Sequence, residues 1–373
     1  MTHPDSLSIR LAHIDDLAAL LALENNCFKH DRLSRRSFKH WVQDPKGILL
    51  LAEQHAQVIA YGLVWCLQGT RLARLYSMAV SPDARGQGLA FTLLEHLESE
   101  ARSRQFLTMR LEVDTRNASA IRLYERAGYR IFGEYSDYYD DHGSALRMHK
   151  PLRGAAQAKV QRFTPWYEQT TAFTCGPAAL MMAMASLKPE IRLSQSLELA
   201  IWREATTIFM TSGLGGCHPL GLALAACHQG FSSEVFLNTR DTLFLEGVRS
   251  AHKKEVMRRV HEDFVDAAEK QAHLTLRYEE VSDAEIQSKL EQGYAWLVLI
   301  STYRLDNKKA PHWVCVSGID EVCLYVHDPD RSEELTQAID CQYMPIARKD
   351  FSTMASFGRG RLRTAIALKP VDG

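Results

Sequence analysis

The second half of the chain places a cysteine where nucleophilic chemistry is possible. Cys175 stands before Gly176 and Pro177, at the start of an apolar run that predicts a helix. Proline is tolerated in the first turn of a helix, so we expect Cys175 at a helix N-terminus. The helix dipole there favours a thiolate, which is the nucleophilic form of the side chain.

A base and an orienting acid for this thiol follow in the sequence. Two strand-like runs, 312–318 and 322–328, flank a turn near Asp320. Antiparallel pairing across this turn would bring His312 opposite or nearly opposite Asp328. Such a pair supplies an imidazole base held by a carboxylate, which a cysteine nucleophile requires.

A glutamine completes this group of residues. Gln169 stands six residues before Cys175 and is placed to donate its side-chain amide to an oxyanion. The segments Q-x-x-x-x-x-C-G-P-A-A, H-W-V-x-V-x-G and D-P resemble the papain-like cysteine peptidases that remove double-glycine leader peptides from bacteriocin precursors. The similarity covers residues 161 to about 335. It implies an α+β papain-like cysteine peptidase fold with the catalytic residues Cys175, His312, Asp328 and Gln169.

Other interpretations of these residues stay open. Cys175 can also be read as a buried core thiol, and His312 with Cys315 as metal ligands, although those two positions alternate faces on a strand. His327 alternates away from Asp328 and is expected at the surface. No metal is expected, because the remaining adjacent pairs lack established metal-site spacing: Cys217 with His218, and Cys227 with His228.

The first half of the chain carries a different kind of site. YSMAVSPDARGQGLA joins a strand to a helix through residues 85–90, where small residues let the backbone approach a ligand closely. Amides at the helix start favour an anion such as a diphosphate. LEVDTRNASAIRLYERAGY follows, with Glu112 on a strand, Asn117 opening a helix and Tyr124 within it.

Together these two segments resemble the GNAT acetyltransferases. Residues 85–90 are similar to the R/Q-x-x-G-x-G/A coenzyme A loop, and the second segment is similar to the branch that acetylates ribosomal-protein N-terminal amines. The similarity spans residues 7 to about 150 and implies an α/β GNAT fold with a mixed central sheet. It also implies acetyl-CoA as the cofactor, bound by Met78, Ala79, Val80, Arg85, Gly86, Gln87, Gly88, Leu89, Ala90 and Asn117.

The same resemblance implies two catalytic residues in this half. Tyr124 would protonate the leaving thiolate, and Glu112 would act through water as the base for the acceptor amine. As alternatives, Tyr124 would be a packing residue and Glu112 a solvated carboxylate. Asp114 stands where the ribosomal-protein branch usually carries arginine, so that substrate is not implied.

Hydrophobic periodicity predicts the elements that must carry these residues. The first half alternates helices with strands, which is typical of a mixed α/β sheet. The predicted helices are 17–27, 88–103 and 118–127, and the predicted strands are 48–53, 58–66, 72–80, 109–113 and 129–135. In the second half, helices at 177–187, 193–204, 219–229 and 256–271 precede strands at 296–302, 313–319 and 322–326, an order that suggests α+β.

Length and composition predict two domains. The 373 residues exceed one average domain, and the small, polar stretch RGAAQAKVQ marks a break. We therefore predict an acetyltransferase domain at 1–152, a linker at 153–160 and a cysteine peptidase domain at 161–373.

The bulk properties restrict the partners and the compartment. The chain has 44 basic and 45 acidic residues, so no nucleic-acid surface is indicated. No secretory signal is recognised, and the apolar runs fall short of the roughly 18 residues that a spanning helix needs. Eight scattered cysteines without a CxxC pair suit free thiols in the cytoplasm. The sequence does not predict the oligomeric state.

These observations predict a bifunctional enzyme that acts on a peptide or protein substrate. One half would be an acetyl-CoA-dependent N-acetyltransferase and the other a Cys-His-Asp peptidase. Two alternatives stay open for the second half: a peptide-binding module that does not cleave, and an amide-forming transferase that uses the same acyl-enzyme.

Overall fold

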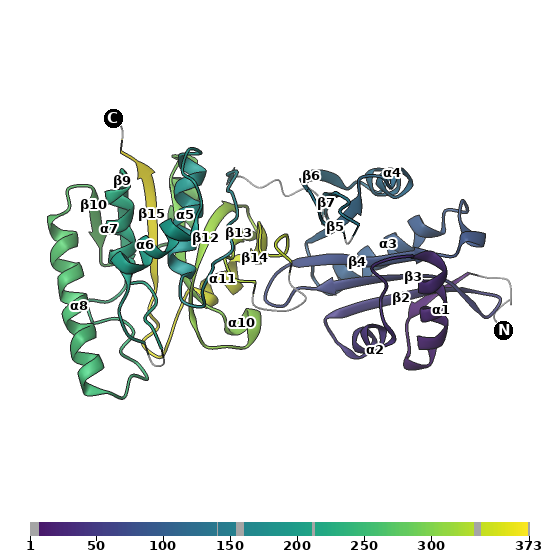
Figure 1. Ribbon diagram of the computed structural model, residues 1–373, viewed down its shortest axis with the longest axis horizontal. Helices are drawn as coiled ribbons and strands as arrows, with labels where there is room; N and C mark the ends of the chain where they lie inside the picture. Colours follow the sequence, from purple (N-terminus) through teal and green to yellow (C-terminus); the bar gives the residue numbers. More distant parts are fainter. Residues whose placement is uncertain (1–6, 140, 154–159, 211–212, 332–336, 372–373) are drawn as a thin grey trace. The chain divides into compact units, whose positions relative to one another are not determined.

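Two separate β-sheets organise the chain (Figure 1). The computed structural model describes residues 7–139, 141–153, 160–210, 213–331 and 337–371. The chain divides into two units, Met1–Ala155 and Ala156–Gly373, and this division falls within the predicted linker 153–160. Residues 154–159 of that linker lie outside the described residues.

The first unit contains a mixed sheet in the order β1-β2-β3-β4-β5-β7-β6. Its elements are β1 (Ser8–Leu11), η1 (Ile14–Asp16), α1 (Leu17–Cys27), α2 (Arg35–Gln43), β2 (Gly47–Gln54), β3 (Gln57–Cys66), β4 (Leu72–Val80), η2 (Pro82–Ala84), α3 (Leu89–Ser103), β5 (Thr108–Asp114), α4 (Ala118–Arg126), β6 (Arg130–Tyr135) and β7 (Ala145–Pro151). Helices α1 and α2 pack on one face of this sheet, and α3 and α4 pack on the other.

Strands β4 and β5 separate along their length. They are parallel and paired only through Leu72–Arg74 and Thr108–Arg110. A register shift in β4 between Leu75 and Ser77 follows immediately. Beyond it, the described ends of β4 and β5 are not paired with each other, so backbone groups between them are left for another partner.

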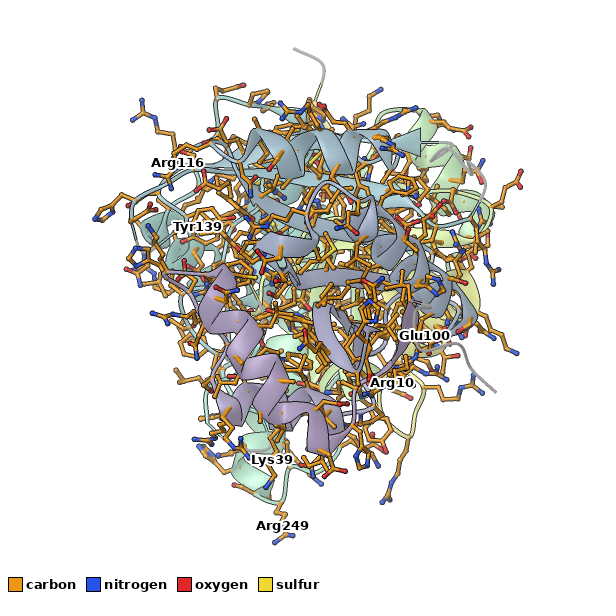
Figure 2. All side chains as sticks on the ribbon, turned by 90° about the vertical axis from the view of Figure 1, so that its right-hand side faces the viewer. Arg10, Lys39, Glu100, Arg116, Tyr139 and Arg249 are labelled. Atoms are coloured by element: carbon orange, nitrogen blue, oxygen red, sulfur yellow. The ribbon has the colours of Figure 1, made fainter. Side chains whose placement is uncertain are left out.

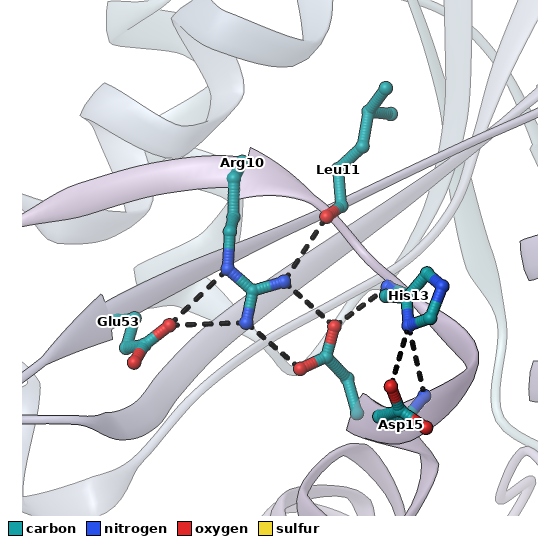
Figure 3. A network of polar contacts seen from close by, with 6 residues as sticks. Arg10, Leu11, His13, Asp15 and Glu53 are labelled. Atoms are coloured by element: carbon teal, nitrogen blue, oxygen red, sulfur yellow. Dashed lines mark hydrogen bonds and ion pairs between the residues drawn. The ribbon is translucent and has the colours of Figure 1, made fainter.

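An arginine on the first strand ties the edge of this sheet together (Figure 3). Arg10 Nη1 and Nη2 donate to the two Asp16 carboxylate oxygens at 2.7 and 2.9 Å, and Nη2 donates to Glu53 Oε2 at 3.1 Å. The Asp16 carboxylate also accepts from the His13 backbone N–H at 2.6 Å. The Arg10 hydrogen bonds hold the pKa of Asp16 below its usual value. This network fixes the start of α1 against β1 and β2.

The second unit contains a sheet in the order β10-β9-β15-β11-β12-β13-β14, with β8 paired to β12. Its elements are β8 (Val160–Gln161), α5 (Cys175–Leu187), α6 (Gln195–Ala205), α7 (Pro219–His228), β9 (Phe231–Leu237), α8 (Ala251–Lys270), β10 (Leu274–Arg277), α9 (Asp283–Glu291), β11 (Ala295–Ser301), α10 (Tyr303–Asp306), β12 (Pro311–Ile319), β13 (Cys323–His327), β14 (Met344–Ala347), α11 (Arg348–Met354) and β15 (Thr364–Pro370). Among the described strands of this second sheet, only β9 and β10 form a parallel pair.

Helices cover both faces of the second sheet. The apolar sides of α5, α6 and α7 form one core, and those of α9 and α11 form another on the opposite face. Helix α5 lies within its core, with every residue from Cys175 to Ala185 buried. A helix that is apolar all round is expected to be buried in this way.

The predicted elements lie close to the observed ones, but several observed elements were not predicted. Helix α2 was not predicted because it has few apolar residues, and only Phe38 and Trp41 of this helix are buried. The expected order of helices first and strands later is wrong, because β9 and β10 lie between helices in the sequence. None of the helices in the described ranges is long and apolar enough to cross a membrane.

Candidate active sites

Cys175 is the first residue of α5 and is 9% exposed. The first helical hydrogen bond runs from Ala178 N to Thr174 O, so the N–H groups of Cys175 and Gly176 precede it. A Cβ on Gly176 would lie 3.0 Å from Cys217 Cβ and 3.2 Å from Trp313 Cδ1. Glycine beside the cysteine therefore lets α5 pack closely on β12.

His312 lies on β12 between the cysteine and a carboxylate. Its Nε2 is 2.6 Å from Asp328 Oδ1, and the Cys175 side chain lies near enough to the ring to influence its pKa. An ionised carboxylate only accepts, so Nε2 carries a proton and Nδ1 is left for the thiol. Burial lowers the pKa of His312, but Asp328 and Cys175 together raise it well above its usual value.

Asp328 follows the end of β13 and is held by hydrogen bonds to backbone groups of Cys341 and Asp330. Its N–H donates to Cys341 O at 2.8 Å, and its Oδ1 accepts from Asp330 N at 2.8 Å. Strand pairing places Cys315 opposite His327, so Asp328 lies diagonally across from His312 rather than directly opposite. Diagonal neighbours are within reach of long side chains.

Gln169 lies next to this group through its backbone. Gln169 N donates to Pro329 O at 2.9 Å, immediately after Asp328. Its side-chain Oε1 is buried, and within the part of the chain that the structure describes it has no hydrogen-bond partner. Such an amide is available to a substrate rather than committed to the fold.

The structure adds a residue that sequence reasoning missed. Trp166 Nε1 donates to Asp328 O at 2.7 Å, which ties the segment before Gln169 to the segment that carries the acid. The aromatic stretch FTPWY contains this residue, but only the fold pairs its indole with a backbone carbonyl.

The expectation for His327 is wrong. This side chain is fully buried and packs edge-on against Tyr343, with ring centroids 4.3 Å apart. Strand β13 lies between β12 and β14 and is covered on both faces, so alternation along it does not lead to solvent.

The neighbouring cysteines and histidines have structural surroundings. Burial raises the pKa of Cys217 well above its usual value, and the nearby Cys175 adds to this effect. His218 Nδ1 accepts from Leu220 N at 3.1 Å and Nε2 lies 3.0 Å from His261 Nδ1. Among the residues that the structure describes, no group of three or more metal-ligating side chains is arranged to hold an ion.

In the first unit, the glycine loop lies directly before α3. Gly86 and Gly88 have φ of 78° and 79°, a conformation that favours glycine, and a Cβ on either would meet nothing within 4 Å. Gly88 is the N-cap of α3, whose first turn has no acidic residue. The space beside these two glycines is therefore open, and no carboxylate of the first turn competes for the helix start.

The other predicted cofactor-binding residues lie around this loop. Met78, Ala79 and Val80 form the end of β4 that is not paired with β5. Arg85 Nε donates to Val80 O at 3.1 Å, which joins the loop to that strand. Asn117 caps α4, and its Oδ1 accepts from Ala120 N at 3.1 Å.

Tyr124 is buried in the core on the α3 and α4 side of the sheet. Its ring packs edge-on against Tyr129, with centroids 5.7 Å apart. Burial raises the pKa of Tyr124, and the neighbouring Tyr139 adds to this shift. A neutral hydroxyl is the form that can donate a proton.

Glu112 lies in an ion pair rather than in solvent. Arg74 Nη2 donates to Glu112 Oε2 at 2.8 Å, and both side chains are buried. Arg74 Nη2 also donates to Tyr138 Oη at 3.0 Å. The alternative of a solvated carboxylate is therefore wrong, and the role of Glu112 as a base stays a prediction.

Further carboxylates lie near this face of the first unit. Arg116 Nη2 bonds Asp114 Oδ2 at 2.5 Å and Asp141 Oδ2 at 2.7 Å. Figure 2 shows the Arg116 and Tyr139 side chains on the same side of the first unit. Burial raises the pKa of Tyr139, and Glu112 and Asp114 raise it further.

Comparison with protein families identifies the second unit. A model of the Peptidase C39 like family matches residues 164–369, which is more than half of the chain. The chain belongs to the Peptidase C39-like family. Cys175, His312 and Asp328 all lie in the matched region of this C39-like chain. Its papain-like fold and its catalytic residues stay predictions.

The first unit matches a second family model. The acetyltransferase (GNAT) family model matches residues 14–129, so this unit is a GNAT domain with the mixed sheet described above. The [ribosomal protein bS18]-alanine N-acetyltransferase of Escherichia coli K12 is 41% identical over 83 residues, which are 21% of this chain and 56% of that protein. The mycothiol acetyltransferase of Streptomyces griseus is 33% identical over 127 residues, which are 31% of this chain and 39% of that protein.

The chain thus spans little more than half the length of the E. coli relative. Among solved structures, the ribosomal-protein-S18-alanine N-acetyltransferase from Escherichia coli is 29% identical, with a TM-score of 0.37, and the match covers 40% of this chain and 96% of that one.

Proposed function

We propose that the chain is a bifunctional enzyme, an acetyl-CoA-dependent N-acetyltransferase joined to a cysteine peptidase. The observation that carries the peptidase half is the position of His312, whose Nε2 lies 2.6 Å from Asp328 Oδ1 and whose pKa is raised by both Asp328 and the nearby Cys175. This arrangement joins a nucleophile, a base and an orienting acid within one buried group.

In the proposed peptidase reaction, Cys175 Sγ attacks the carbonyl carbon of a peptide bond. His312 Nδ1 takes the thiol proton and later gives it to the leaving amine. Asp328 keeps the imidazole in the required tautomer and stabilises its charged form. Because Asp328 and Cys175 raise the pKa of His312, the imidazolium is stabilised beside the thiolate. Water then hydrolyses the resulting thioester on Cys175.

Two donors are available for the oxyanion of this reaction. One is the backbone N–H of Cys175, which precedes the first helical hydrogen bond. The other is Nε2 of the Gln169 side chain, whose buried Oε1 makes no hydrogen bond to the described residues. Removing one such donor from an enzyme typically lowers kcat by about 10²- to 10³-fold.

The first unit has features that fit acetyl-CoA. The space beside Gly86 and Gly88 at the start of α3 is open, and a helix N-terminus is suited to a diphosphate. The unpaired backbone of β4 beside them suits an extended chain that carries amide groups. When bound, the cofactor supplies an acetyl thioester. Residues 86–90 would hold the diphosphate, and Met78–Val80 would hold the segment that leads to the thioester.

The acceptor is proposed to be the amine of a peptide or protein. Tyr124 would donate its proton to the departing thiolate, and Glu112 would take the proton of the amine through water. Arg74 forms an ion pair with Glu112. The E. coli relative is named for acetylating an alanine of a ribosomal protein, which supports an N-terminal amine as the acceptor class. We infer that both halves use one peptide: the peptidase exposes an amine, and the transferase caps it.

The eight cysteines are all free, which suits the reducing cytoplasm as the proposed location.

Labelling with a thiol-reactive peptide electrophile tests the peptidase half. We expect the wild-type chain to be labelled at Cys175, with loss of labelling in Cys175→Ala but not in Cys217→Ala or Cys227→Ala. Equal labelling of all three variants would contradict the proposal and favour a peptide-binding module. Capture of the acylated product by an added amine in preference to water would indicate an amide-forming transferase.

A further inference from the structure

A buried carboxylate on α6 holds the segment that carries Gln169. Glu198 is fully buried, yet its partners all come from residues 167–170. Oε1 accepts from Thr170 N at 2.8 Å, and Oε2 accepts from Thr170 Oγ1 at 2.7 Å and from Tyr167 Oη at 3.0 Å. These three bonds lie on either side of Gln169 in the sequence.

The opposite side of the same segment is attached to the residues around Asp328. Trp166 Nε1 donates to Asp328 O, and Gln169 N donates to Pro329 O at 2.9 Å. Glu168 forms an ion pair with Arg331 at 3.1 Å. The segment that carries Gln169 is therefore hydrogen-bonded to Glu198 of α6 on one side and to Asp328 and Pro329 on the other.

The burial of Glu198 is supported by its position on the helix. It lies in the first turn of α6, which begins at Gln195 after the N-cap Ser194. A helix N-terminus favours a carboxylate, and the three donors satisfy its oxygens. A buried carboxylate with these contacts is held firmly, so the backbone of residues 167–170 is held with it.

We propose that Glu198 is a positioning residue for Gln169, so that the Gln169 amide meets the oxyanion that forms when Cys175 attacks a carbonyl. This inference rests on the proposed thiol chemistry. A catalytic donor must be held to within about 0.5 Å, and the buried Oε1 of Gln169 has no hydrogen-bond partner among the described residues that would fix the side chain. Glu198 itself touches neither the substrate nor the thiol, and it acts through the backbone of residues 167–170.

Two reagents separate this role from a general structural role. Iodoacetamide alkylates a thiolate without forming an oxyanion, whereas p-nitrophenyl acetate acylates it through one. In the second reaction the bond from Cys175 Sγ to the acetyl carbon forms, the bond to p-nitrophenolate breaks, and p-nitrophenolate leaves. Both products are read on the tryptic peptide 163–192 of the full chain, in which Cys175 is the only cysteine.

We expect Gln169→Ala to lower the acylation rate by about 100-fold and Glu198→Ala by at least about 10-fold. Alkylation of Cys175 should change by no more than about twofold in either variant, because both leave the thiolate and His312 in place. Glu198→Ala combined with Gln169→Ala should be no slower than Gln169→Ala alone, since Glu198 acts only through Gln169.

Two milder variants keep the test valid if Glu198→Ala does not fold. Glu198→Gln retains one acceptor for Thr170 N and can donate to the hydroxyls, so it should restore most of the acylation. Tyr167→Phe removes a single bond to Glu198, so it should slow acylation a few-fold in the wild-type background and not at all beside Gln169→Ala.

Three results would overturn the inference. Additive losses in the double variant, or an equal fall in alkylation and acylation, would show that Glu198 only supports the fold. A wild-type chain that is alkylated but never acylated at Cys175 would overturn the proposed chemistry and the role of Glu198 together.

Discussion

At the scale of single residues, the second unit depends on one histidine with two partners. Asp328 and Cys175 oppose the effect of burial and raise the pKa of His312. The contact of Nε2 with Asp328 leaves Nδ1 for the thiol. The charge of this histidine is therefore set by its neighbours rather than by solvent.

Replacing the acid should change this charge. We expect Asp328→Asn to lower the pKa of His312. The substitution removes the negative charge that raises this pKa, whereas burial still lowers it. NMR titration of the His312 ring measures this shift. Asp350→Asn, which removes an ion-pair partner of Arg304 on the surface, is the matched control and should leave His312 unchanged. An unaltered His312 titration in Asp328→Asn would refute the assignment of its partners.

Local sequence indicated some of these residues and not others. Cys175 before Gly-Pro and His312 at the start of a strand could be located because short motifs and strand pairing indicate their surroundings. Glu198 could not be predicted, because its partners lie 28 and 31 residues earlier and meet it only after α6 packs. His327 was predicted wrongly because alternation indicates solvent only where one face of a sheet is exposed.

At the scale of elements, each site lies at the beginning of a helix. Helix α3 presents its first amides after Gly88, and α5 presents Cys175 as its first residue. Both helices could be predicted from the sequence, α3 from its apolar periodicity and α5 from its continuous apolar run. Strands β3 and β4 could be predicted as well. Helix α2 and strand β9 could not, since their apolar residues are few or mixed with polar ones.

The glycine loop can be tested by one substitution. We expect Gly88→Val to weaken acetyl-CoA binding by at least about 10-fold, because a β-branched residue is strained at this positive φ and its side chain would occupy the space in front of the α3 amides. Isothermal titration calorimetry measures the affinity. Gly69→Val strains a similar conformation, with φ of 74°, in the turn between β3 and β4. An equal loss of affinity in this control would argue against a specific role for the loop.

The contact between α7 and α8 makes the second unit sensitive to acid. His218 and His261 share a hydrogen bond, and burial lowers the pKa of both below the usual value. Below pH of about 6.5 the unfolded chain binds more protons than the folded one. The free energy of unfolding should therefore fall as the pH decreases, by up to about 1.4 kcal/mol per pH unit for each histidine.

Urea unfolding followed between pH 7.5 and pH 5, a range of about 2.5 units around the histidine pKa, measures this slope. His261→Gln should flatten it, whereas His252→Gln, an exposed position on the same helix, should not. The same slope in wild type and His261→Gln would exclude this pair as its cause.

At the scale of the whole molecule, the chain contains two units that match different family models. Each unit has its own sheet and its own cores, so we expect the two activities to be separable by single substitutions. The composition break at 153–160 indicated this division because a linker needs no apolar periodicity. The contacts that Arg74 makes with Glu112 and Tyr138 could not be predicted, because they join side chains from β4, β5 and the segment after β6.

The central claim is that Cys175 cleaves a peptide and that the GNAT domain can cap the new amine. The most direct measurement is mass spectrometry of a peptide extract incubated with the chain and with acetyl-CoA that carries a deuterated acetyl group. Wild type should produce new N-termini bearing the deuterated acetyl group, Tyr124→Phe should leave these N-termini free, and Cys175→Ala should produce none. The same set of new N-termini from wild type and from Cys175→Ala would contradict the account.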